Sequence, residues 1–286
     1  MFEEFLADYK RREKKKTAET YKKLLSQFEK WLDNQGSQEK FKREDVLSFL
    51  KTQHSWSNSS KNVFLSALSS WARSELEKVQ PAVTDQEKLE VRRLKRIKGI
   101  RSYEARPKEK EALNLDQIVD LRIAMDQDTQ NLFWVLLWFG IRVGELKKIK
   151  KIGLEDRSLT VETLKRKGSE AERTLYFDDY TGRILQHSRD KGLLDLPYQT
   201  IYKRFKKASK LTSIKLTPHV CRHTFATHMS SRTDPFTLAQ MLGHSITGVA
   251  QARGGAKVTG DYVHPAQERI RKVMLERHYL IPLEVK

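Results

Sequence analysis

Apolar side chains recur every three or four positions along residues 1–80, with lysines and arginines between them. Such spacing lines one face of a helix with apolar groups and leaves the opposite face to solvent. The pattern predicts four short helices, through residues 2–9, 21–32, 46–50 and 63–71. Because each helix would bury one face, we expect a small helical domain with Trp31 and Trp71 in its core.

Charged residues replace this apolar pattern between residues 81 and 110. Helical spacing persists there only in part, and basic pairs such as Arg92-Arg93 recur. This composition is typical of a connecting segment. We therefore expect a basic interdomain linker at 81–110, which joins a helical domain at 1–80 to a second domain at 111–286.

The second domain combines helical spacing with a short strand-like alternation. Residues 129–139 are apolar on nearly all sides, which predicts a core helix closed by Gly140. Residues 159–163 and 174–177 alternate with the period of a strand and predict an antiparallel hairpin with a basic turn. Further helices are expected after Arg142 as far as Ile149, at 198–210, from Thr217, between Asp234 and Gly243, and at 270–280. The predicted fold is mainly α with a small antiparallel β-hairpin or sheet.

The stretch Thr217-Pro218-His219-Val220-Cys221-Arg222-His223 has the character of a helix start. Thr217 suits the N-cap, and Pro218 suits the first helical position, where a missing N–H costs nothing. His219 and Arg222 then lie one turn apart, near the positive end of the helix dipole. This combination favours a bound phosphate.

Composition points to a polyanionic partner. Lys and Arg number 55 against 37 Asp and Glu, a net charge of +18, and the basic residues are spread along the chain. Nucleic acid is the commonest polyanion, and a solvated Lys/Glu surface is the alternative interpretation. The single cysteine, Cys221, excludes a disulfide framework and a cysteine-rich zinc site and favours an intracellular protein. We find no apolar run of transmembrane length and no P-loop.

Four motifs, in order along the chain, together resemble the tyrosine recombinase family in its Xer and phage-integrase branch. They are Gly140-Ile141-Arg142-Val143-Gly144-Glu145-Leu146, the Thr217 to His223 stretch, Leu242-Gly243-His244-Ser245 and Tyr262-Val263-His264. Residues 1–80 also resemble the helical core-binding domain of that family, so the likeness covers nearly the whole chain. It implies a catalytic domain of tyrosine-recombinase type at 111–286.

The resemblance implies strand cleavage without a metal or nucleotide cofactor. Tyr262 would attack the DNA backbone, leaving a 3′-phosphotyrosyl bond and a free 5′-hydroxyl. Arg142 and Arg222 would stabilise the charge on the phosphate. The remaining expected roles are His219 as base, Lys167 (or Lys165) as the acid for the leaving 5′-oxygen, His244 as a hydrogen-bond partner of the phosphate, and Glu145 as the residue that orients the arginine-bearing helix.

Taken singly, these residues have plainer interpretations. Arg142 and Glu145 would form a local salt bridge, and His244 would be a hydrogen-bonded structural histidine. The lysines of the hairpin turn would be solvated. Tyr262 would anchor the C-terminal helix. The functional interpretation rests on the four motifs together.

The partner that the resemblance implies is a double-stranded DNA recombination site. The protein would form a homotetramer on synapsed DNA and be a monomer or weak oligomer when free, in the cytoplasm on the nucleoid and not on a membrane. The segment 270–286 would be free to dock on a neighbouring subunit. Contacts with the DNA backbone are expected from Lys10, Lys14, Lys61, Arg92, Arg93, Arg106, Lys165 and Arg166.

One departure from the family pattern concerns the tyrosine. The span between His244 and Tyr262 is longer than usual and rich in glycine. This leaves open whether Tyr262 acts in its own active site or in a neighbour's.

Two alternative functions remain at this point. One is DNA relaxation of the type IB topoisomerase kind, and the other is DNA binding by an inactive relative. A metal-dependent nuclease is disfavoured because the carboxylates, such as Asp116, Asp156 and Asp178, lack metal-ligand spacing.

Overall fold

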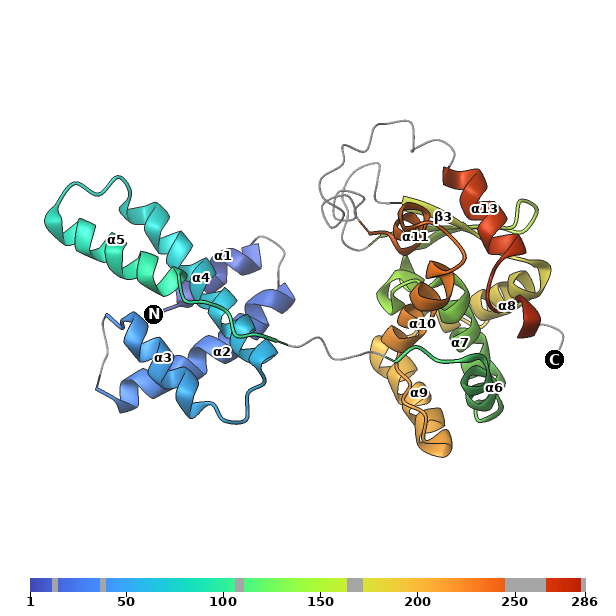
Figure 1. Ribbon diagram of the computed structural model, residues 1–286, viewed down its shortest axis with the longest axis horizontal. Coiled ribbons are helices and arrows are strands. Elements are labelled where there is room, and N and C mark those ends of the chain that lie inside the picture. The colour runs from blue at the N-terminus through green and yellow to red at the C-terminus, as the bar shows by residue number, and fades with distance from the viewer. Residues whose placement is uncertain (12–14, 37–39, 106–110, 164–171, 245–265, 284–286) are drawn as a thin grey trace. The chain divides into compact units, whose positions relative to one another are not determined.

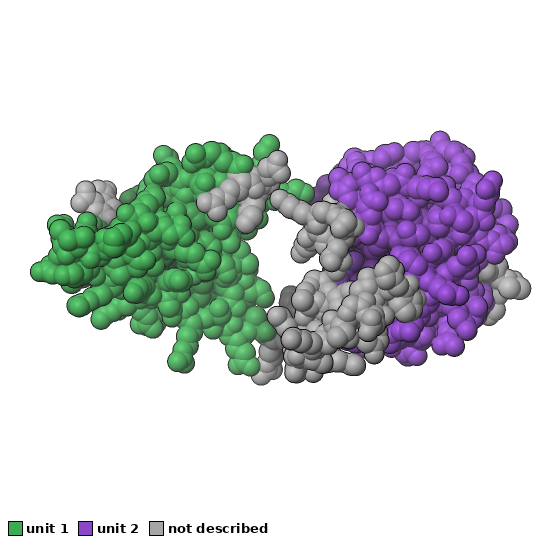
Figure 2. Space-filling model, turned by 90° about the horizontal axis from the view of Figure 1, so that it is seen from above, with its two compact units in different colours: residues 1–108 green, residues 109–286 purple. Residues whose placement is uncertain are grey.

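The chain folds into two compact units, Met1–Lys108 and Glu109–Lys286 (Figures 1 and 2). The structure is a computed structural model that describes residues 1–11, 15–36, 40–105, 111–163, 172–244 and 266–283. Each unit has its own hydrophobic core, and each is considered by itself.

Unit 1 is entirely helical in the residues that the structure describes. Its elements are α1 (Glu3–Arg11), α2 (Lys15–Asn34), α3 (Arg43–Thr52), α4 (Asn58–Val79) and α5 (Asp85–Lys98). The four helices predicted for residues 1–80 are confirmed, and the hydroxyl of Ser57 caps α4 by accepting the N–H of Ser60. Their apolar faces meet in a core rich in aromatic rings, which includes Trp71, with Trp31 packed at its edge.

The segment expected to be a linker contains the fifth helix of this unit. Thr84 and Glu87 form a capping box at its start. Leu94 and Ile97 are buried in the core of unit 1 although charged residues surround them in the sequence. The division between the units falls after Lys108, inside the segment expected to be the linker, but the first part of that segment belongs to unit 1. Leu94 and Ile97, with Val91 packed beside them at helical spacing, dock α5 on the core although most of its other side chains are charged.

Unit 2 surrounds one buried helix, α7 (Gln127–Phe139), in which every residue from Leu132 to Phe139 is at most 1% exposed. Asp126 caps the start of α7. The other helices are α6 (Leu115–Ile123), α8 (Asp179–Asp190), α9 (Tyr198–Thr212), α10 (Pro218–Ser230), α11 (Pro235–Leu242) and α13 (Ala266–Glu276), with short 3-10 segments η1 (Val143–Lys148), η3 (Leu193–Asp195) and η5 (Ile281–Leu283).

A small antiparallel sheet in the order β1-β2-β3 completes unit 2. The strands are β1 (Ile149–Gly153), β2 (Ser158–Glu162) and β3 (Glu172–Tyr176). β2 and β3 are the predicted hairpin. β1 was not predicted, because the helical spacing after Arg142 runs on to Ile149, and the segment from Val143 to Lys148 is a 3-10 helix in place of the expected α-helix.

The C-terminal segment packs on its own chain. α13 lies beside β3 (Figure 1), where the N–H of Tyr176 contacts the sulfur of Met274 at 3.4 Å. His278 and Tyr279 then reach the last turn of α7: the imidazole lies 2.9 Å from the carbonyl oxygen of Trp138, and the hydroxyl donates to that of Leu137 at 3.0 Å. None of the helices that the structure describes is both long enough and apolar enough to cross a bilayer.

Candidate active site

Arg142 is placed by the way α7 ends. Gly140 closes the helix in the left-handed conformation, with φ of 56°, and a Cβ there would lie only 2.3 Å from the ring of Phe225. Glycine is therefore required both for the backbone turn and for the close approach of α10. Ile141 is fully buried next in the chain, which fixes the backbone from which Arg142 projects.

Arg142 and Glu145 form the local ion pair that their spacing predicts. Arg142 Nη1 donates to Glu145 Oε1 at 2.9 Å, and the backbone N–H of Arg142 donates to Oε2 at 2.8 Å. The carboxylate is fully buried, whereas the Arg142 side chain is 24% exposed. Glu145 thus anchors an arginine that still reaches solvent.

The side chain of Arg222 approaches Glu145 from α10. Thr217 is the N-cap of this helix and Pro218 is its first residue, as predicted. Cys221 and Phe225 are fully buried and seat α10 in the core, so Arg222 points inward. Its Nη1 donates to the carbonyl oxygen of Gly140 at 2.8 Å, and Nη1 lies 4.0 Å from Glu145 Oε2.

His244 is brought to Arg222 by the end of α11. The left-handed Gly243 closes this helix, with φ of 65°, as predicted. Arg222 Nη2 donates to the carbonyl oxygen of Leu242 at 2.6 Å and lies 3.0 Å from His244 Nε2. Because a guanidinium has no acceptor, Nε2 is unprotonated in this contact. His244 is nevertheless exposed to solvent.

His219 lies on the first turn of α10, one turn before Arg222. Unlike Arg222 it is exposed. The expected neighbourhood of a titratable ring, a helix N-terminus and an arginine is therefore present, although the arginine is turned toward the core.

Arg173 is a buried member of this cluster that the sequence analysis missed. It lies on β3, and its guanidinium donates to Glu145 Oε2 at 2.8 Å, to Thr163 Oγ1 at 2.7 Å and to the carbonyl oxygen of Met241 at 2.9 Å. The sequence signal was the alternation along β3. Arg173 and Leu175 are two residues apart, so both lie on the inward face of the strand. An arginine on the core side of a strand needs a buried partner.

Glu145 is the common partner of the three arginines. Burial raises the pKa of its carboxyl, but the charge and hydrogen bond of Arg173, with the contacts of Arg142, outweigh this and hold the pKa below its usual value. Burial, with repulsion from Arg142, lowers the pKa of Arg222 to about 10, so it is charged at neutral pH. Three guanidinium groups thus face one carboxylate. This excess of positive charge favours the binding of an additional anion.

Several predicted site residues lie outside the described part of the chain. They are the hairpin residues Lys165, Arg166 and Lys167, the tyrosine Tyr262, and the basic residues Lys14 and Arg106. Among the residues that are described, no three His, Cys, Asp or Glu side chains are grouped so that they could hold a metal ion.

The described basic residues of unit 1 fall into two kinds. Lys10 and Arg92 are exposed, as a DNA contact requires. The Lys61 ammonium lies 5.2 Å from the centre of the Tyr103 ring. Arg93 instead pairs with Glu90 and donates to the carbonyl oxygen of Phe41, so its guanidinium is engaged within unit 1.

A basic helix face in unit 2 was not singled out from the sequence. α9 contains no acidic residue; it buries Ile201 and Phe205, and its lysines face solvent. The signal was available in the spacing of its exposed basic residues, Lys203, Lys206, Lys207 and Lys210. Such a face suits a phosphate backbone.

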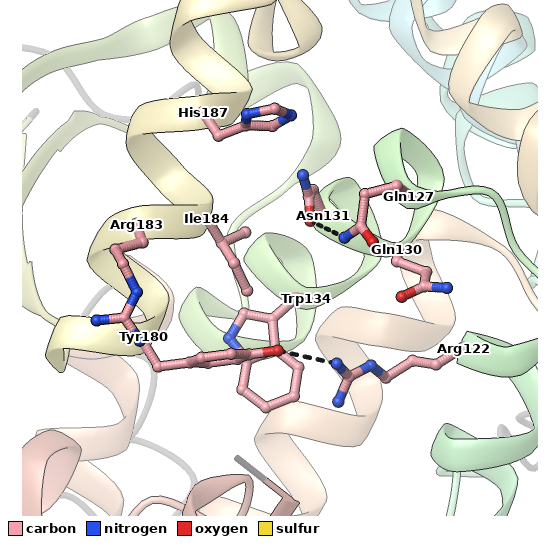
Figure 3. A pocket seen from close by; sticks show the side chains of 9 residues that line it. All are labelled: Arg122, Gln127, Gln130, Asn131, Trp134, Tyr180, Arg183, Ile184 and His187. Atoms are coloured by element: carbon pink, nitrogen blue, oxygen red, sulfur yellow. Dashed lines mark hydrogen bonds between the residues drawn. The ribbon is translucent and has the colours of Figure 1, made fainter. Parts of the chain in front are cut away.

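A pocket between α7 and α8 lies apart from these residues (Figure 3). Arg122 donates to the Tyr180 hydroxyl at 3.0 Å and lies 4.7 Å from the centre of the Trp134 ring. None of the nine residues that line the pocket is a predicted site residue. The arginine cluster on Glu145 is therefore the candidate site.

Two family models match the chain. That of the phage integrase family matches residues 111–252, and that of the phage integrase N-terminal SAM-like domain matches residues 2–75. The chain belongs to the phage integrase family, as its motifs predicted.

Curated relatives include tyrosine recombinases of archaea and bacteria. XerA of Saccharolobus solfataricus is 33% identical over 181 residues, covering 60% of this chain and 58% of the relative. XerC of Staphylococcus saprophyticus is 29% identical over 160 residues, covering 49% of this chain and 50% of the relative. The matches thus span between half and three fifths of these relatives.

Solved structures with the same fold include complexes with DNA. A lambda integrase tetramer bound to a Holliday junction has a TM-score of 0.59 at 17% identity and covers 85% of this chain and 76% of its own. The XerH recombinase bound to a palindromic difH substrate, in a post-cleavage complex, has a TM-score of 0.59 at 16% identity and covers 88% and 77%. At these identities the likeness shows the fold, and the predicted mainly α class is confirmed.

Proposed function

We propose that this protein is a site-specific DNA recombinase that cleaves and rejoins DNA strands through a 3′-phosphotyrosyl intermediate on Tyr262. The observation that carries the proposal is the cluster of Arg142 and Arg222 on the buried Glu145. Cleavage of a phosphodiester builds charge on the non-bridging oxygens, and guanidinium groups held in place beforehand stabilise that charge without reorganising.

The two arginines contribute differently to this site. Arg142 is partly exposed and presents its guanidinium to solvent. Arg222 is held by the carbonyl groups of Gly140 and Leu242 and by His244, which engage three of the five N–H groups that a guanidinium has. Arg222 thereby keeps a fixed orientation, and Arg142 meets the phosphate from the solvent side.

The proton transfers are assigned from the family motifs. The Tyr262 phenol, with an ordinary pKa of about 10, must lose its proton as it attacks phosphorus. His219, exposed one turn before Arg222, takes that proton. Lys167, with Lys165 as the alternative, gives a proton to the departing 5′-oxygen. Because the phosphotyrosyl bond conserves the energy of the broken one, rejoining requires no nucleotide.

The proposed partner is double-stranded DNA carrying a recombination site. The related XerH and lambda integrase chains were solved bound to DNA, the latter as a tetramer. By that likeness we propose a homotetramer on synapsed DNA, acting on the nucleoid in the cytoplasm. The basic face of α9, together with Lys10 and Arg92 of unit 1, would lie on the phosphate backbone.

The test captures covalently bound DNA from a mixture of sequences, so the target site need not be chosen in advance. The protein is incubated with a pool of nicked, random-sequence duplexes in EDTA, and DNA that stays attached in detergent is recovered and sequenced. Tyr262→Phe is compared with Tyr198→Phe, which alters an exposed tyrosine of α9. We expect a covalent adduct enriched in one sequence, absent only in Tyr262→Phe.

Other results would overturn the proposal. An adduct that survives Tyr262→Phe would exclude this nucleophile, and loss of cleavage in EDTA would exclude the metal-independent mechanism. Plasmid relaxation without strand exchange between two enriched sites would favour the topoisomerase-like alternative. DNA binding without any adduct would favour an inactive relative.

A further inference from the structure

We infer that Arg173 is a positioning residue for the reacting phosphate. Through Glu145 it holds Arg142 and Arg222 in position, and through Met241 it holds the end of α11 in position. This inference rests on the proposed function. Arg173 belongs to none of the motifs that identify the family, and its side chain is only 8% exposed.

One guanidinium joins three segments that each carry part of the site. Nη2 donates to Glu145, which follows Arg142 in the chain. Nη1 donates to Thr163, directly after β2, and Nε donates to the carbonyl oxygen of Met241 in the last turn of α11. β3, which carries Arg173, is thereby fixed to β2, to η1 and to α11. Lysine has a single nitrogen and could not satisfy this geometry.

The end of α11 packs directly against the Arg173 side chain. A Cβ on Gly243 would lie 2.8 Å from Arg173 Nη1 and 3.0 Å from the Thr163 side chain. Gly243 is the residue between Leu242, whose carbonyl accepts from Arg222, and His244, which contacts Arg222. A displaced Arg173 would therefore disturb Arg222 from two sides, through Glu145 and through the end of α11.

Electrostatics supports the same assignment. Arg173 is the first of the influences that lower the pKa of the buried Glu145 against the effect of burial. The other charged groups facing this carboxylate among the described residues are Arg142 and Arg222. Without Arg173, Glu145 would bind its two remaining arginines more closely and draw them away from a phosphate.

The experiment uses the full chain and a suicide duplex made from the enriched sequence of the capture experiment. Cleavage by wild type and Arg173→Met is timed on the native duplex and on one with a neutral methylphosphonate at the scissile position. Arg183→Met, which alters an exposed arginine of α8, is the matched control. DNA affinity and thermal unfolding are measured in parallel.

We expect Arg173→Met to cleave the native duplex roughly 100-fold more slowly, because small misplacements of catalytic groups cost about that much. DNA affinity should be retained. On the methylphosphonate, whose neutral phosphorus centre needs less help from arginines, the difference from wild type should largely vanish. A residue that only stabilises the fold would slow both substrates alike.

Three results would overturn the inference: native cleavage at the wild-type rate, an equal loss on both duplexes, or a loss of the same size in Arg183→Met. If Arg173→Met does not fold, Arg173→Lys must show a smaller but still selective loss, because lysine keeps the charge but its single nitrogen cannot reach all three partners. A wild-type protein that forms no adduct on either duplex would contradict the proposed function itself, so the two failures are distinguishable.

Discussion

The guanidinium of Arg222 donates from Nη1 to the carbonyl oxygen of Gly140 at 2.8 Å, so α10 is tied to the last turn of the most buried helix of unit 2. The same glycine lies against the ring of Phe225, one turn further along α10. Polar and apolar contacts thus fix the junction from which Arg142 projects. Its geometry can be tested by substitution.

Replacing Gly140 should destabilise unit 2 far more than replacing a glycine with similar backbone torsion. Gly140→Ala adds a Cβ 2.3 Å from Phe225, whereas Gly192, with φ of 64°, has no atom within 4 Å of the same position. We expect Gly192→Ala to cost about 1 kcal/mol of unfolding free energy from backbone strain, and Gly140→Ala about 3 kcal/mol. Urea unfolding measures both. Equal costs would contradict the close packing.

Arg142 should matter for cleavage and little for stability. Arg142→Ala removes a guanidinium from the phosphate, and we expect it to slow adduct formation by about 3 kcal/mol of activation free energy or more, by analogy with losing one oxyanion donor. Glu145 would keep Arg173 and the backbone N–H of residue 142 as hydrogen-bond partners, so the melting temperature should fall only modestly. Arg183→Ala, a change at an exposed position of α8, should leave the rate unaltered. A rate loss explained by unfolding would argue against a phosphate contact.

His278 should make the stability of unit 2 depend on pH. Its Nδ1 accepts the N–H of Leu280 at 3.2 Å, so the proton resides on Nε2, which donates to Trp138. Burial, partly opposed by the Trp138 hydrogen bond, lowers the pKa of His278 to about 3. The unfolded chain takes up a proton below about pH 6.5 and the folded chain does not, so stability is lost as pH falls.

The expected slope is about 1.4 kcal/mol per pH unit between roughly pH 6 and pH 4 for this histidine. Chemical unfolding at several pH values measures it. His278→Gln should reduce the slope, whereas His187→Gln, at an exposed site on α8, should keep it. An unchanged slope in His278→Gln would mean that the buried ring is not the source.

The exposed face of α9 should contribute to DNA affinity through salt-dependent contacts. Changing Lys203, Lys206, Lys207 and Lys210 to Gln should weaken binding and reduce the slope of log affinity against log salt by about 0.9 for each phosphate that is no longer neutralised. Fluorescence anisotropy over a range of KCl measures this. Lys191→Gln with Lys272→Gln, at exposed positions outside α9, is the control. An unaltered slope in the α9 variant would exclude this face.

Local signals in the sequence located most elements of the site. Thr217 and Asp234 cap their helices as predicted, and Gly140 and Gly243 end theirs in the left-handed conformation. Each of these features depends on a few neighbouring residues, so sequence reasoning reached them. The family match confirmed the family that the motifs indicated, while the roles of Arg142, Lys167, His219, Arg222, His244 and Tyr262 stay predictions.

Long-range features were missed for physical reasons. β1 follows a 3-10 segment whose apolar spacing imitates a helix, and only pairing with β2 makes it a strand. α5 is mostly charged, and only the core of unit 1 reveals what Leu94 and Ile97 do. Arg173 gains its partners from segments 28 and 68 positions away, which no local pattern encodes.

The contacts of His278 and Tyr279 with the last turn of α7 have a consequence for synthesis of the chain. The two carbonyl groups that they engage belong to residues made 140 and 142 positions earlier. During translation, the helix end that precedes Arg142 acquires these partners only when the C-terminal segment leaves the ribosome. The helix end from which Arg142 projects is thus completed only after residues 278 and 279 have been made, so the proposed phosphate site would be assembled late in the synthesis of unit 2.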